Sequence, residues 1–558
     1  MYAALAANLP FSDSAIVLII ATSFITYRIF KRFEPQRPTL VGFLLIVIPS
    51  LLVPALHLHV PSLPLSVAIT FTLYYCLILL YIAIYRLSPF HPLAKYPGPI
   101  KNKLSKFTTS YIVSTGTQHM YFKQLHQRCG DIVRTGPNEL SVNCADAVQP
   151  ILGAGGLQKG PYWSNRDPDG HLPSVLTTTD PVQHKQRRRT WDRAFSTAAI
   201  KNYHDIIVRN TRELLGHFEK RAGQQIDFSM WMRHFSFDFM GDIVFGTRFN
   251  MMQAGCDVTG VWNMLEAGTA LFTTVAHTPW LITYLRFIPG AAKVRTRVFA
   301  ITEEYVNRRV EQGSNTKDLF YYLTDEEGVE SNRPSMPTVQ SDGPLAVIAG
   351  SDTVATTLTV LWYYFLRNPL IFSRLRDEVD AYFPLGEEPL DFTRMVNMPY
   401  LNACINEALR LLPPVMSGSP RYVKPGSRGM MVGPYFVPEG SQVFSHTYTL
   451  QRNPRYFSPL PNSFWPDRWL PEQDRHKISS HEEFILDPTA FQPFSFGPAS
   501  CVGKNLALVE LRAVTCFITQ RFDFKPKEGF RMESWEEGIE DYFVAKRPAL
   551  PVVVEVRR

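Results

Sequence analysis

The stretch 494–503 of this chain reads FSFGPASCVG and runs directly into KNLALVELR, whose apolar residues have helical spacing. Gly497 and Gly503 bracket Cys501, and glycine permits a tight turn in which backbone N–H groups point at the sulfur. A helix that begins just after Cys501 also adds partial positive charge, which favours thiolate over thiol. The loop therefore indicates a stabilised thiolate, although an ordinary core cysteine beside a helix start would use the same residues.

A second segment places opposite charges within one helical run. Glu407 and Arg410 lie three residues apart in NACINEALRLL, on one helix face where the two charges can meet. Apolar residues flank both charges, which indicates burial, and a buried ion pair needs a further partner. Arg468, in the later segment FWPDRW, is a candidate for that partner. An exposed ion pair of little energetic weight is the alternative.

A third segment, 345–367, has helical spacing throughout and carries AGSDT at 349–353. Asp342 is expected to be the N-cap of this helix, with Pro344 in its first turn. Gly350 inside the helix costs about 1 kcal/mol relative to Ala, so a reason for its presence is expected. We expect a local widening of the helix there, although a core helix softened by small residues would show the same pattern.

A fourth segment, DPVQHKQRRRTW at 180–191, is strongly basic. His184 and Arg188 are four residues apart and would point the same way from a helix. A solvated cationic helix face accounts for some of the other basic residues. The segment therefore predicts a helix on which His184 and Arg188 are candidates for a shared site, while other basic residues face solvent.

Together these segments resemble the cytochrome P450 superfamily and follow its order along the chain. The haem loop of that family reads Phe-x-x-Gly-x-Arg-x-Cys-x-Gly, and this sequence departs from its fixed positions only at Ala499. The other segments are similar to the family's Glu-x-x-Arg, Pro-Glu/Asp-Arg-Phe/Trp, Ala/Gly-Gly-x-Asp/Glu-Thr-Thr and Asp-Pro-x-x-His-x-x-x-Arg motifs. Val354 replaces the second Thr of the oxygen-activation motif. The resemblance implies a mainly α fold with small β-sheets, preceded here by N-terminal transmembrane helices.

The resemblance also implies a haem b cofactor, with Cys501 as the axial ligand of the iron and with NADPH used indirectly. Residues that contact or shape the haem site by family position are Phe494, Gly497, Gly503, His184, Arg188 and Arg421. The last three would bind the haem propionates, and we expect them to make up for the Arg missing at Ala499. Glu407, Arg410 and Arg468 would form a structural triad behind the haem.

The same resemblance assigns the oxygen chemistry to three residues of the 345–367 helix. Gly350 would give room for oxygen and water, Thr353 would hydrogen-bond the dioxygen, and Asp352 would relay protons from solvent. Substrate-pocket candidates by family position are Tyr162, Trp163, Ala349, Val415, Met416 and Phe543. Aromatic and apolar residues are more often plain core, so each candidate has a structural alternative.

Residues 1–88 are expected to form a membrane anchor. Positions 39–85 contain no Asp, Glu, Lys or Arg, and a break near 57–64 divides them into two spans. With an earlier apolar run, this gives three transmembrane segments at about 14–30, 39–60 and 65–85. A signal peptide is the alternative for the first run, but that run lacks a basic leader and a cleavage site. A single span is the alternative for the whole anchor.

Basic residues set the expected orientation of this anchor. Four basic residues lie between the first and second segments, and Arg86 follows the third. The positive-inside rule then places the N-terminus in the lumen and the catalytic domain, 100–558, in the cytosol. The resemblance to microsomal family members implies the endoplasmic reticulum membrane. The Pro-rich segment 89–99 is expected to be a stiff hinge between anchor and body.

The composition suits a globular body. The 558 residues are 45% hydrophobic and 19% charged, with a formal charge of +7, so we expect no nucleic-acid partner. Seven scattered cysteines without a Cys-x-x-Cys pair argue against a disulfide scaffold or a structural zinc site. Helical spacing dominates beyond residue 100, with strand-like runs at 131–134, 139–142, 435–437 and 551–556. We expect one large domain and a monomer.

A thiolate haem, an oxygen-activating Thr and the lack of a nicotinamide fingerprint imply a monooxygenase that receives its electrons from a membrane NADPH–haemoprotein reductase. One atom of O2 would enter a C–H bond or alkene of a lipophilic substrate, and the other would leave as water. The anchor resembles those of fungal microsomal members that modify terpenoids and related secondary metabolites. Lys185, Arg187 and Arg193 are candidates for contact with the acidic surface of a reductase.

Two rival interpretations stay open. A thiolate-haem isomerase or dehydratase would keep the fold and need no reductase, although the paired Asp352 and Thr353 argue against it. A non-enzymatic membrane haem carrier or sensor would keep the haem without turnover. Turnover with a purified reductase separates both from a monooxygenase.

Overall fold

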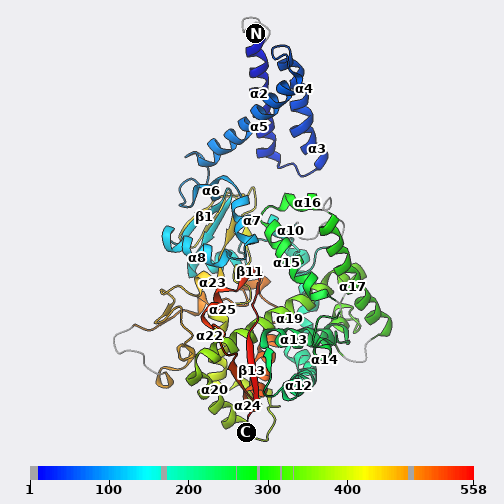
Figure 1. The fold of residues 1–558 in the computed structure, drawn as a ribbon, viewed down its shortest axis with the longest axis vertical. Coiled ribbons are helices and arrows are strands. Elements are labelled where there is room, and N and C mark those ends of the chain that lie inside the picture. Colours follow the sequence, from blue (N-terminus) through cyan, green and yellow to red (C-terminus); the bar gives the residue numbers. More distant parts are fainter. Residues whose placement is uncertain are drawn as a thin grey trace.

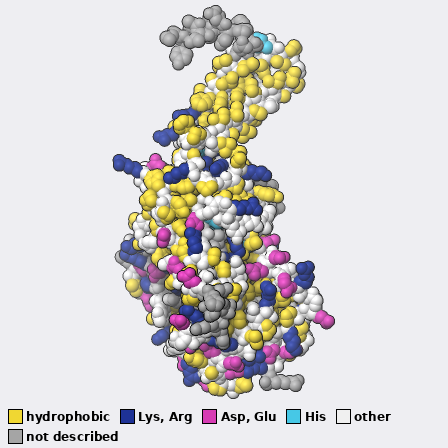
Figure 2. All heavy atoms as spheres, turned by 90° about the vertical axis from the view of Figure 1, so that its left-hand side faces the viewer, with side chains coloured by type: hydrophobic (Ala, Val, Ile, Leu, Met, Phe, Trp, Pro, Cys, Tyr) yellow, Lys and Arg dark blue, Asp and Glu magenta, His cyan; other side chains and the backbone are white. Residues whose placement is uncertain are grey.

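The computed structural model describes residues 11–164, 172–258, 260–285, 289–313, 317–330, 332–475 and 483–557. A stalk of N-terminal helices stands on one end of a large, mainly helical body, and the C-terminus lies toward the opposite end (Figure 1). Apolar side chains cover the stalk, and Lys and Arg side chains gather where it meets the body (Figure 2). The expected fold class, mainly α with small β-sheets, is confirmed.

From Phe11 on, where the described residues begin, the stalk contains three helical stretches. They are α2 (Phe11–Phe33), a continuous run of α3 (Pro38–Gly42), η1 (Phe43–Val47) and α4 (Ile48–His57), and α5 (Leu63–Leu87). Each stretch is long and apolar enough to cross a membrane, judged by length and composition, and the three coincide with the segments expected from the sequence. A fourth helix of this kind, α19 (Met336–Arg367), is mostly buried inside the body and is therefore a core helix.

A proline leaves one carbonyl of the short π-helix η1, inside the second stretch, without a backbone partner. The Leu44 carbonyl would bond the N–H group five residues on, but that residue is Pro49, which has no N–H. The Tyr74 hydroxyl of α5 donates to this carbonyl instead, at 3.0 Å, and lies 2.6 Å from the Thr26 hydroxyl of α2. One tyrosine thus joins all three stretches through polar contacts inside an apolar bundle.

The Pro-rich segment 89–99 packs against the body. Leu93 and Tyr96 are buried in one cluster with residues of strand β1 (Ile132–Gly136) and its neighbours. The Pro97 carbonyl accepts a 2.7 Å hydrogen bond from the N–H of Arg134, and the Arg134 side chain donates to the Arg86 carbonyl in α5 at 3.0 Å. The segment expected to be a hinge is therefore held to the body by the buried Leu93 and Tyr96 and by the bond to the Pro97 carbonyl.

Helices make up most of the body, from α6 beside the stalk to α25 near the C-terminus. In chain order they are α6 (Ile100–Leu104), α7 (Phe107–Ser114), α8 (Gln118–Cys129), η2 (Ala145–Ala147), α9 (Val148–Leu152), α10 (Pro161–Ser164), α11 (Pro181–Ala194), α12 (Thr197–Glu219), α13 (Phe228–Phe245), α14 (Met251–Ala254), α15 (Val261–Ala276), η3 (Pro279–Leu281), α16 (Ile282–Leu285), α17 (Pro289–Gln312), α18 (Leu319–Leu323), α19, α20 (Pro369–Tyr382), α21 (Phe392–Val396), α22 (Pro399–Leu411), α23 (Thr447–Leu450), η4 (Pro466–Trp469), η5 (Glu472–Asp474), η6 (Pro488–Ala490), η7 (Gly497–Ala499), α24 (Lys504–Arg521) and α25 (Glu533–Glu537). Side-chain caps start several of them; the Asp180 carboxylate, for example, accepts from the N–H of Val182 at the start of α11.

The strands form small sheets around this helical body. The largest sheet has the order β1, β2 (Glu139–Val142), β7 (Gln442–Phe444), β4 (Arg421–Tyr422), with β2 and β7 parallel and the other pairs antiparallel. A second has the order β10 (Phe522–Pro526), β13 (Pro551–Val556), β3 (Gln225–Asp227). Two-stranded sheets pair β5 (Met430–Val432) with β6 (Tyr435–Val437), β8 (Phe457–Ser458) with β9 (Ile485–Leu486), and β11 (Glu540–Tyr542) with β12 (Val544–Lys546). The four predicted strand-like runs are confirmed as β1, β2, β6 and β13.

Helices α12, α13, α19 and α24 pack together and supply much of one large hydrophobic cluster at the centre of the body. The start predicted for α19 was wrong, because the helix begins at Met336 rather than Leu345 and contains Pro344. Asp342 lies inside it, and its carboxylate accepts from the N–H of Val175 at 2.8 Å and from the Trp191 indole at 3.1 Å. In the sequence alone, a buried Asp that bonds to other segments cannot be distinguished from an Asp that caps the start of a helix.

Candidate active site

The cysteine loop, residues 494–503, includes η7 and ends at the start of α24. Gly497 has φ +72°, in the left-handed region, and a Cβ there would lie 2.2 Å from the Leu152 carbonyl oxygen of α9. The N–H of Cys501 donates to the Phe494 carbonyl at 2.9 Å, which closes the loop. Helix α24 begins at Lys504, as the sequence predicts. The loop is thus fixed on both sides of the cysteine.

Replacing Gly497 by Ala is expected to destabilise the protein by about 2–4 kcal/mol, because the left-handed backbone and the collision with Leu152 both oppose a side chain. Gly426→Ala is the matched control, since Gly426 has φ +87° but open space around it. Thermal unfolding followed by circular dichroism measures both variants. Equal losses in the two variants would contradict a role for the contact with Leu152.

The Cys501 side chain is accessible although dense protein surrounds it. Burial is the largest influence on its thiol and raises the pKa above the ordinary value. The N–H groups of Gly503 and Lys504, which bond to the sulfur, and the charge of Arg188 act in the opposite direction. Two backbone N–H groups thus point at the Cys501 sulfur, while burial opposes its ionisation.

Helix α19 packs against α24 and carries Ala349 and Thr353, which both keep accessible surface although the helix is mostly buried. The Thr353 hydroxyl donates to the Ala349 carbonyl at 2.8 Å. Gly350 faces α13, where an added Cβ would lie 2.4 Å from the Met240 sulfur. The expected widening of the helix at Gly350 was wrong, because α19 is continuous there and the missing side chain makes room for Met240.

Asp352 is held by a residue that the sequence motifs do not reveal. Nη1 of Arg547, just after β12, lies 2.6 Å from the Asp352 carboxylate and 2.8 Å from the Thr356 hydroxyl. Asp352 also borders a hollow of about 20 Å³, room for about one water, which Glu266 and Lys546 line as well. Arg547 is separated from Asp352 by 195 positions, so no local pattern could have found it.

Four basic groups converge beside the cysteine loop. Arg188 Nη1 donates to the Ser500 carbonyl at 2.7 Å, and burial lowers the pKa of Arg421 to about 10. Burial, followed by the charges of the other three groups, lowers the pKa of His184 to about 4. Burial and then Arg421 and Arg188 lower the pKa of Lys159 to about 7. The structure brings together His184, Arg188 and Arg421, as expected, and adds Lys159, which the sequence reasoning missed.

The predicted triad of charges is buried. Nε and Nη2 of Arg410 both lie 2.8 Å from the Glu407 carboxylate, and Arg468 Nε lies 3.0 Å from it. The Trp469 indole also donates to Glu407, at 2.9 Å. Burial, the largest influence, opposes ionisation of Glu407, yet Arg410 and Arg468 bring its pKa below the usual value. Backbone carbonyls accept further hydrogen bonds from both arginines, that of Gln451 from Arg410 and that of Leu460 from Arg468, each at 2.8 Å.

The six pocket candidates divide into two groups. Tyr162, Trp163 and Met416 are buried, whereas Ala349, Val415 and Phe543 keep accessible surface. The Trp163 indole donates to the Pro420 carbonyl at 3.0 Å, and its ring centre lies 5.6 Å from that of Phe543 and 5.3 Å from that of Tyr162. Three candidates therefore form one aromatic cluster, in which Trp163 supports Phe543.

Two of the three cations expected to meet a reductase have partners inside the protein. Arg187 Nη2 lies 2.9 Å from the Asp342 carboxylate, and Arg193 pairs with Asp325, Glu327 and Glu330 at 2.9–3.1 Å. Lys185 is exposed. Acids distant in the sequence thus pair with Arg187 and Arg193 inside the protein, and contact of the three cations with a reductase stays a prediction.

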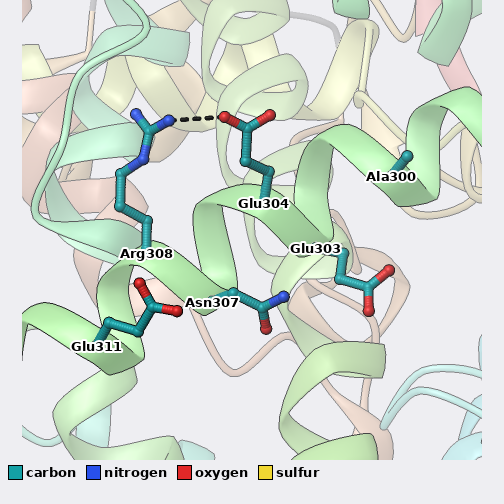
Figure 3. Close-up of a pocket in the computed structure, with 6 residues that line it drawn as sticks. All are labelled: Ala300, Glu303, Glu304, Asn307, Arg308 and Glu311. Carbon is teal, nitrogen blue, oxygen red and sulfur yellow. Dashed lines mark hydrogen bonds and ion pairs between the residues drawn. The ribbon is translucent and has the colours of Figure 1, made fainter.

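A larger surface hollow of about 420 Å³ lies along α17 (Figure 3). Its lining residues are Ala300, Glu303, Glu304, Asn307, Arg308 and Glu311. All six belong to one helix, and Arg308 pairs with Glu304 across one turn at 2.6 Å. This arrangement is typical of a solvated helix face, so we assign no site to it.

Fold and site define a helical protein that presents an accessible cysteine sulfur next to a cluster of basic side chains. The sequence model described as Cytochrome P450 matches residues 97–549. Similar proteins include cytochrome P450 monooxygenase nodW of Hypoxylon pulicicidum, 34% identical over 86% of this chain and 86% of its own length. Tryprostatin B 6-hydroxylase of Aspergillus fumigatus is 30% identical, over 84% of this chain and 81% of its own. The chain therefore belongs to the cytochrome P450 family and is a monooxygenase of that family.

Solved structures agree on the fold. The heme domain of cytochrome P450DA superposes with a TM-score of 0.68 at 20% identity, and the match covers 83% of this chain and 98% of that one. The residues present also fit the haem that this family carries. Cys501 offers an accessible sulfur, and the basic cluster offers cations for the two propionate carboxylates.

Proposed function

We propose that Cys501 binds the haem iron and that the enzyme uses NADPH electrons, delivered by a membrane reductase, to hydroxylate or epoxidise a lipophilic secondary metabolite such as a terpenoid. The observation that carries this proposal is the accessible Cys501 sulfur at the start of α24, next to the helix that carries Ala349 and Thr353. When bound, the haem supplies the activation of oxygen. Tryprostatin B 6-hydroxylase is named as a hydroxylase, which supports this type of reaction.

In this proposal each polar group of the site holds a charge or a proton. The N–H groups of Gly503 and Lys504 stabilise negative charge on the Cys501 sulfur. Thr353 Oγ gives up its bond to the Ala349 carbonyl and holds a proton near the reacting oxygen. Asp352, positioned by Arg547, resupplies that proton from the small hollow beside it.

The other groups bind the cofactor or shape the pocket. His184, Arg188 and Arg421 hold the propionates, while Glu407, Arg410 and Arg468 maintain the fold behind the haem. Phe494, Gly497 and Gly503 shape the cysteine loop. Pocket residues with accessible surface are Ala349, Val415 and Phe543, with Tyr162, Trp163 and Met416 packed behind them. A pocket with these apolar walls suits a lipophilic substrate.

Residues 1–88 anchor the enzyme in the endoplasmic reticulum membrane, and residues 100–558 form the cytosolic catalytic domain. Three helical stretches of sufficient length and hydropathy support the anchor. Basic residues in the last turns of the first and third stretches, Arg32 and Arg86 among them, support a lumenal N-terminus. This placement puts the catalytic domain on the side where the NADPH reductase works and keeps it next to substrate dissolved in the bilayer.

Labelled oxygen tests the proposed reaction. Membranes that contain this chain and a reductase are supplied with NADPH and ¹⁸O₂, and extracts are screened by mass spectrometry. We expect a product that carries one labelled oxygen atom and that is absent without the reductase. A product without label, or one that forms equally well without the reductase, would rule the proposal out.

Replacing Thr353 by Ala is expected to lower the product formed per NADPH consumed by about ten- to a hundredfold, because the site loses a positioned proton donor. Thr357→Ala is the matched control, since its hydroxyl bonds the Thr353 carbonyl one turn along the same helix. Parallel assays of NADPH oxidation and product measure the ratio. Equal ratios for the two variants would show that Thr353 has no special role.

A further inference from the structure

The hairpin of β11 and β12 turns at a single residue, Phe543, which has a left-handed backbone. Its strands pair as far as Tyr542 with Val544, so Phe543 alone forms the tip. Phe543 has φ +74°, a conformation that a bulky side chain rarely adopts because the side chain crowds its own backbone. A strained tip of this kind persists only where neighbouring groups hold it in place.

Asp541, two residues before the tip, provides such a group. The N–H of Phe543 donates to Oδ1 of Asp541 at 3.2 Å, and Asp541 is fully buried. Burial, the largest influence, raises the pKa of Asp541 to about 7, although its hydrogen bonds act in the opposite direction. Either protonation state offers an acceptor oxygen to the Phe543 N–H, so the bond needs an oxygen at this position rather than a full negative charge.

Other groups hold the stem of the hairpin. On one strand, the N–H of Asp541 donates to the Gly116 carbonyl at 2.7 Å. On the other strand, the N–H of Ala545 donates to the Pro414 carbonyl at 2.8 Å. These backbone bonds do not involve the Asp541 carboxyl group. Removing that group would therefore release the tip while the stem keeps its place.

The Phe543 ring packs against the aromatic cluster of the proposed pocket. Its centre lies 5.6 Å from that of Trp163 in an edge-to-face arrangement, beside the buried Tyr162. The residues on either side of it, Tyr542 and Val544, line the small hollow beside α19 instead. Adjacent residues thus face different sides, and the backbone conformation at Phe543 decides which side its ring occupies.

We infer that Asp541 is a positioning residue that sets the substrate selectivity of the enzyme by holding the Phe543 ring in the wall of the pocket. The inference rests on the proposed function, in which Phe543 lines that pocket, and it adds a residue that does not touch the substrate itself. Asp541 acts through the backbone of Phe543. Its effect is therefore confined to ligands that are large enough to reach the ring.

Two imidazoles of different size test this inference through binding rather than activity. Full-length protein in detergent micelles is loaded with haem, and each imidazole is titrated while the shift of the haem absorbance band is followed. Asp541→Ala is expected to weaken the binding of clotrimazole, an imidazole with three aromatic rings, about two- to tenfold, the range for one aromatic contact. The binding of unsubstituted imidazole is expected to be unchanged.

Further variants separate positioning from a general loss of stability. Asp541→Asn keeps an oxygen that can accept from the Phe543 N–H and is expected to bind clotrimazole as the wild type does. Asp391→Ala is the matched control, because the exposed Asp391 accepts from the N–H of Thr393 at 2.9 Å in the same way. In a Phe543→Ala background, Asp541→Ala is expected to cause no additional weakening, since the ring that it positions is gone.

Equal clotrimazole binding by Asp541→Ala and the wild type, the same loss in Asp541→Asn, or an additional loss in the Phe543→Ala background would overturn the inference. So would a loss of imidazole binding in Asp541→Ala, which would show that Asp541 supports the fold as a whole. Asp541→Leu fills the same space without an acceptor and is a second variant with the same expected result as Asp541→Ala. A wild-type protein whose spectrum does not respond to imidazole would overturn the proposed function, and this inference with it.

Discussion

Replacing Cys501 by Ser is expected to lower product formation at least about a hundredfold while the protein remains folded, because an alcohol oxygen cannot replace a thiolate on the iron. The fold is expected to survive for a structural reason. The Cys501 side chain keeps accessible surface, so the smaller serine leaves no sealed cavity in the core. The loop bond from the N–H of Cys501 to the Phe494 carbonyl comes from the backbone and is kept.

Product formed with a reductase, together with circular dichroism, measures this effect. Cys256→Ser is the matched control, because Cys256 is also accessible and belongs to another part of the body. The control is expected to keep full activity. Undiminished product from Cys501→Ser would remove the basis for the whole site.

Replacing Glu407 by Ala is expected to destabilise the protein by about 3–5 kcal/mol, because two buried arginines lose their carboxylate. Arg410 and Arg468 are fully buried, so solvent cannot compensate their charges. The Trp469 indole and the N–H of Trp465 lose their acceptor as well. Since domains are stable by only about 5–15 kcal/mol, a large fraction of the protein molecules is expected to stay unfolded or haem-free.

The Glu407→Ala variant is compared with an exposed ion pair in the same body. Glu387→Ala breaks a 2.8 Å pair with Arg394 in which both side chains are about half exposed, and it is expected to cost less than about 1 kcal/mol. The yield of folded protein in membranes and urea unfolding measure both variants. A Glu407→Ala protein as stable as Glu387→Ala would show that the triad is not structural.

Local signals explain why much of the fold and site could be predicted. The cysteine loop, the Glu407–Arg410 pair and the strand-like runs lie in short continuous stretches whose residue spacing alone sets their geometry. The structure places α24 directly after Cys501, as expected. The stalk helices follow from hydropathy and length in the same way.

The predictions that failed depended on contacts between distant segments. Asp342 has the pattern of a cap but bonds to Val175 and Trp191. Gly350 was expected to mark a widening of the helix, but its missing side chain accommodates Met240 in a continuous helix. Arg547 and Lys159 became visible only when the fold brought them to Asp352 and Arg421, because no sequence spacing connects these pairs. The contacts of such residues depend on packing between distant segments rather than on local propensity.

The absorbance spectrum of the reduced carbon-monoxide complex tests the central claim most directly. The full-length wild-type protein is loaded with haem, reduced and exposed to carbon monoxide. We expect the strongly red-shifted Soret band of a thiolate-ligated complex. The N–H groups of Gly503 and Lys504 donate hydrogen bonds to the Cys501 sulfur, which stabilise its negative charge. A band at the position typical of histidine or neutral thiol ligation would contradict the account.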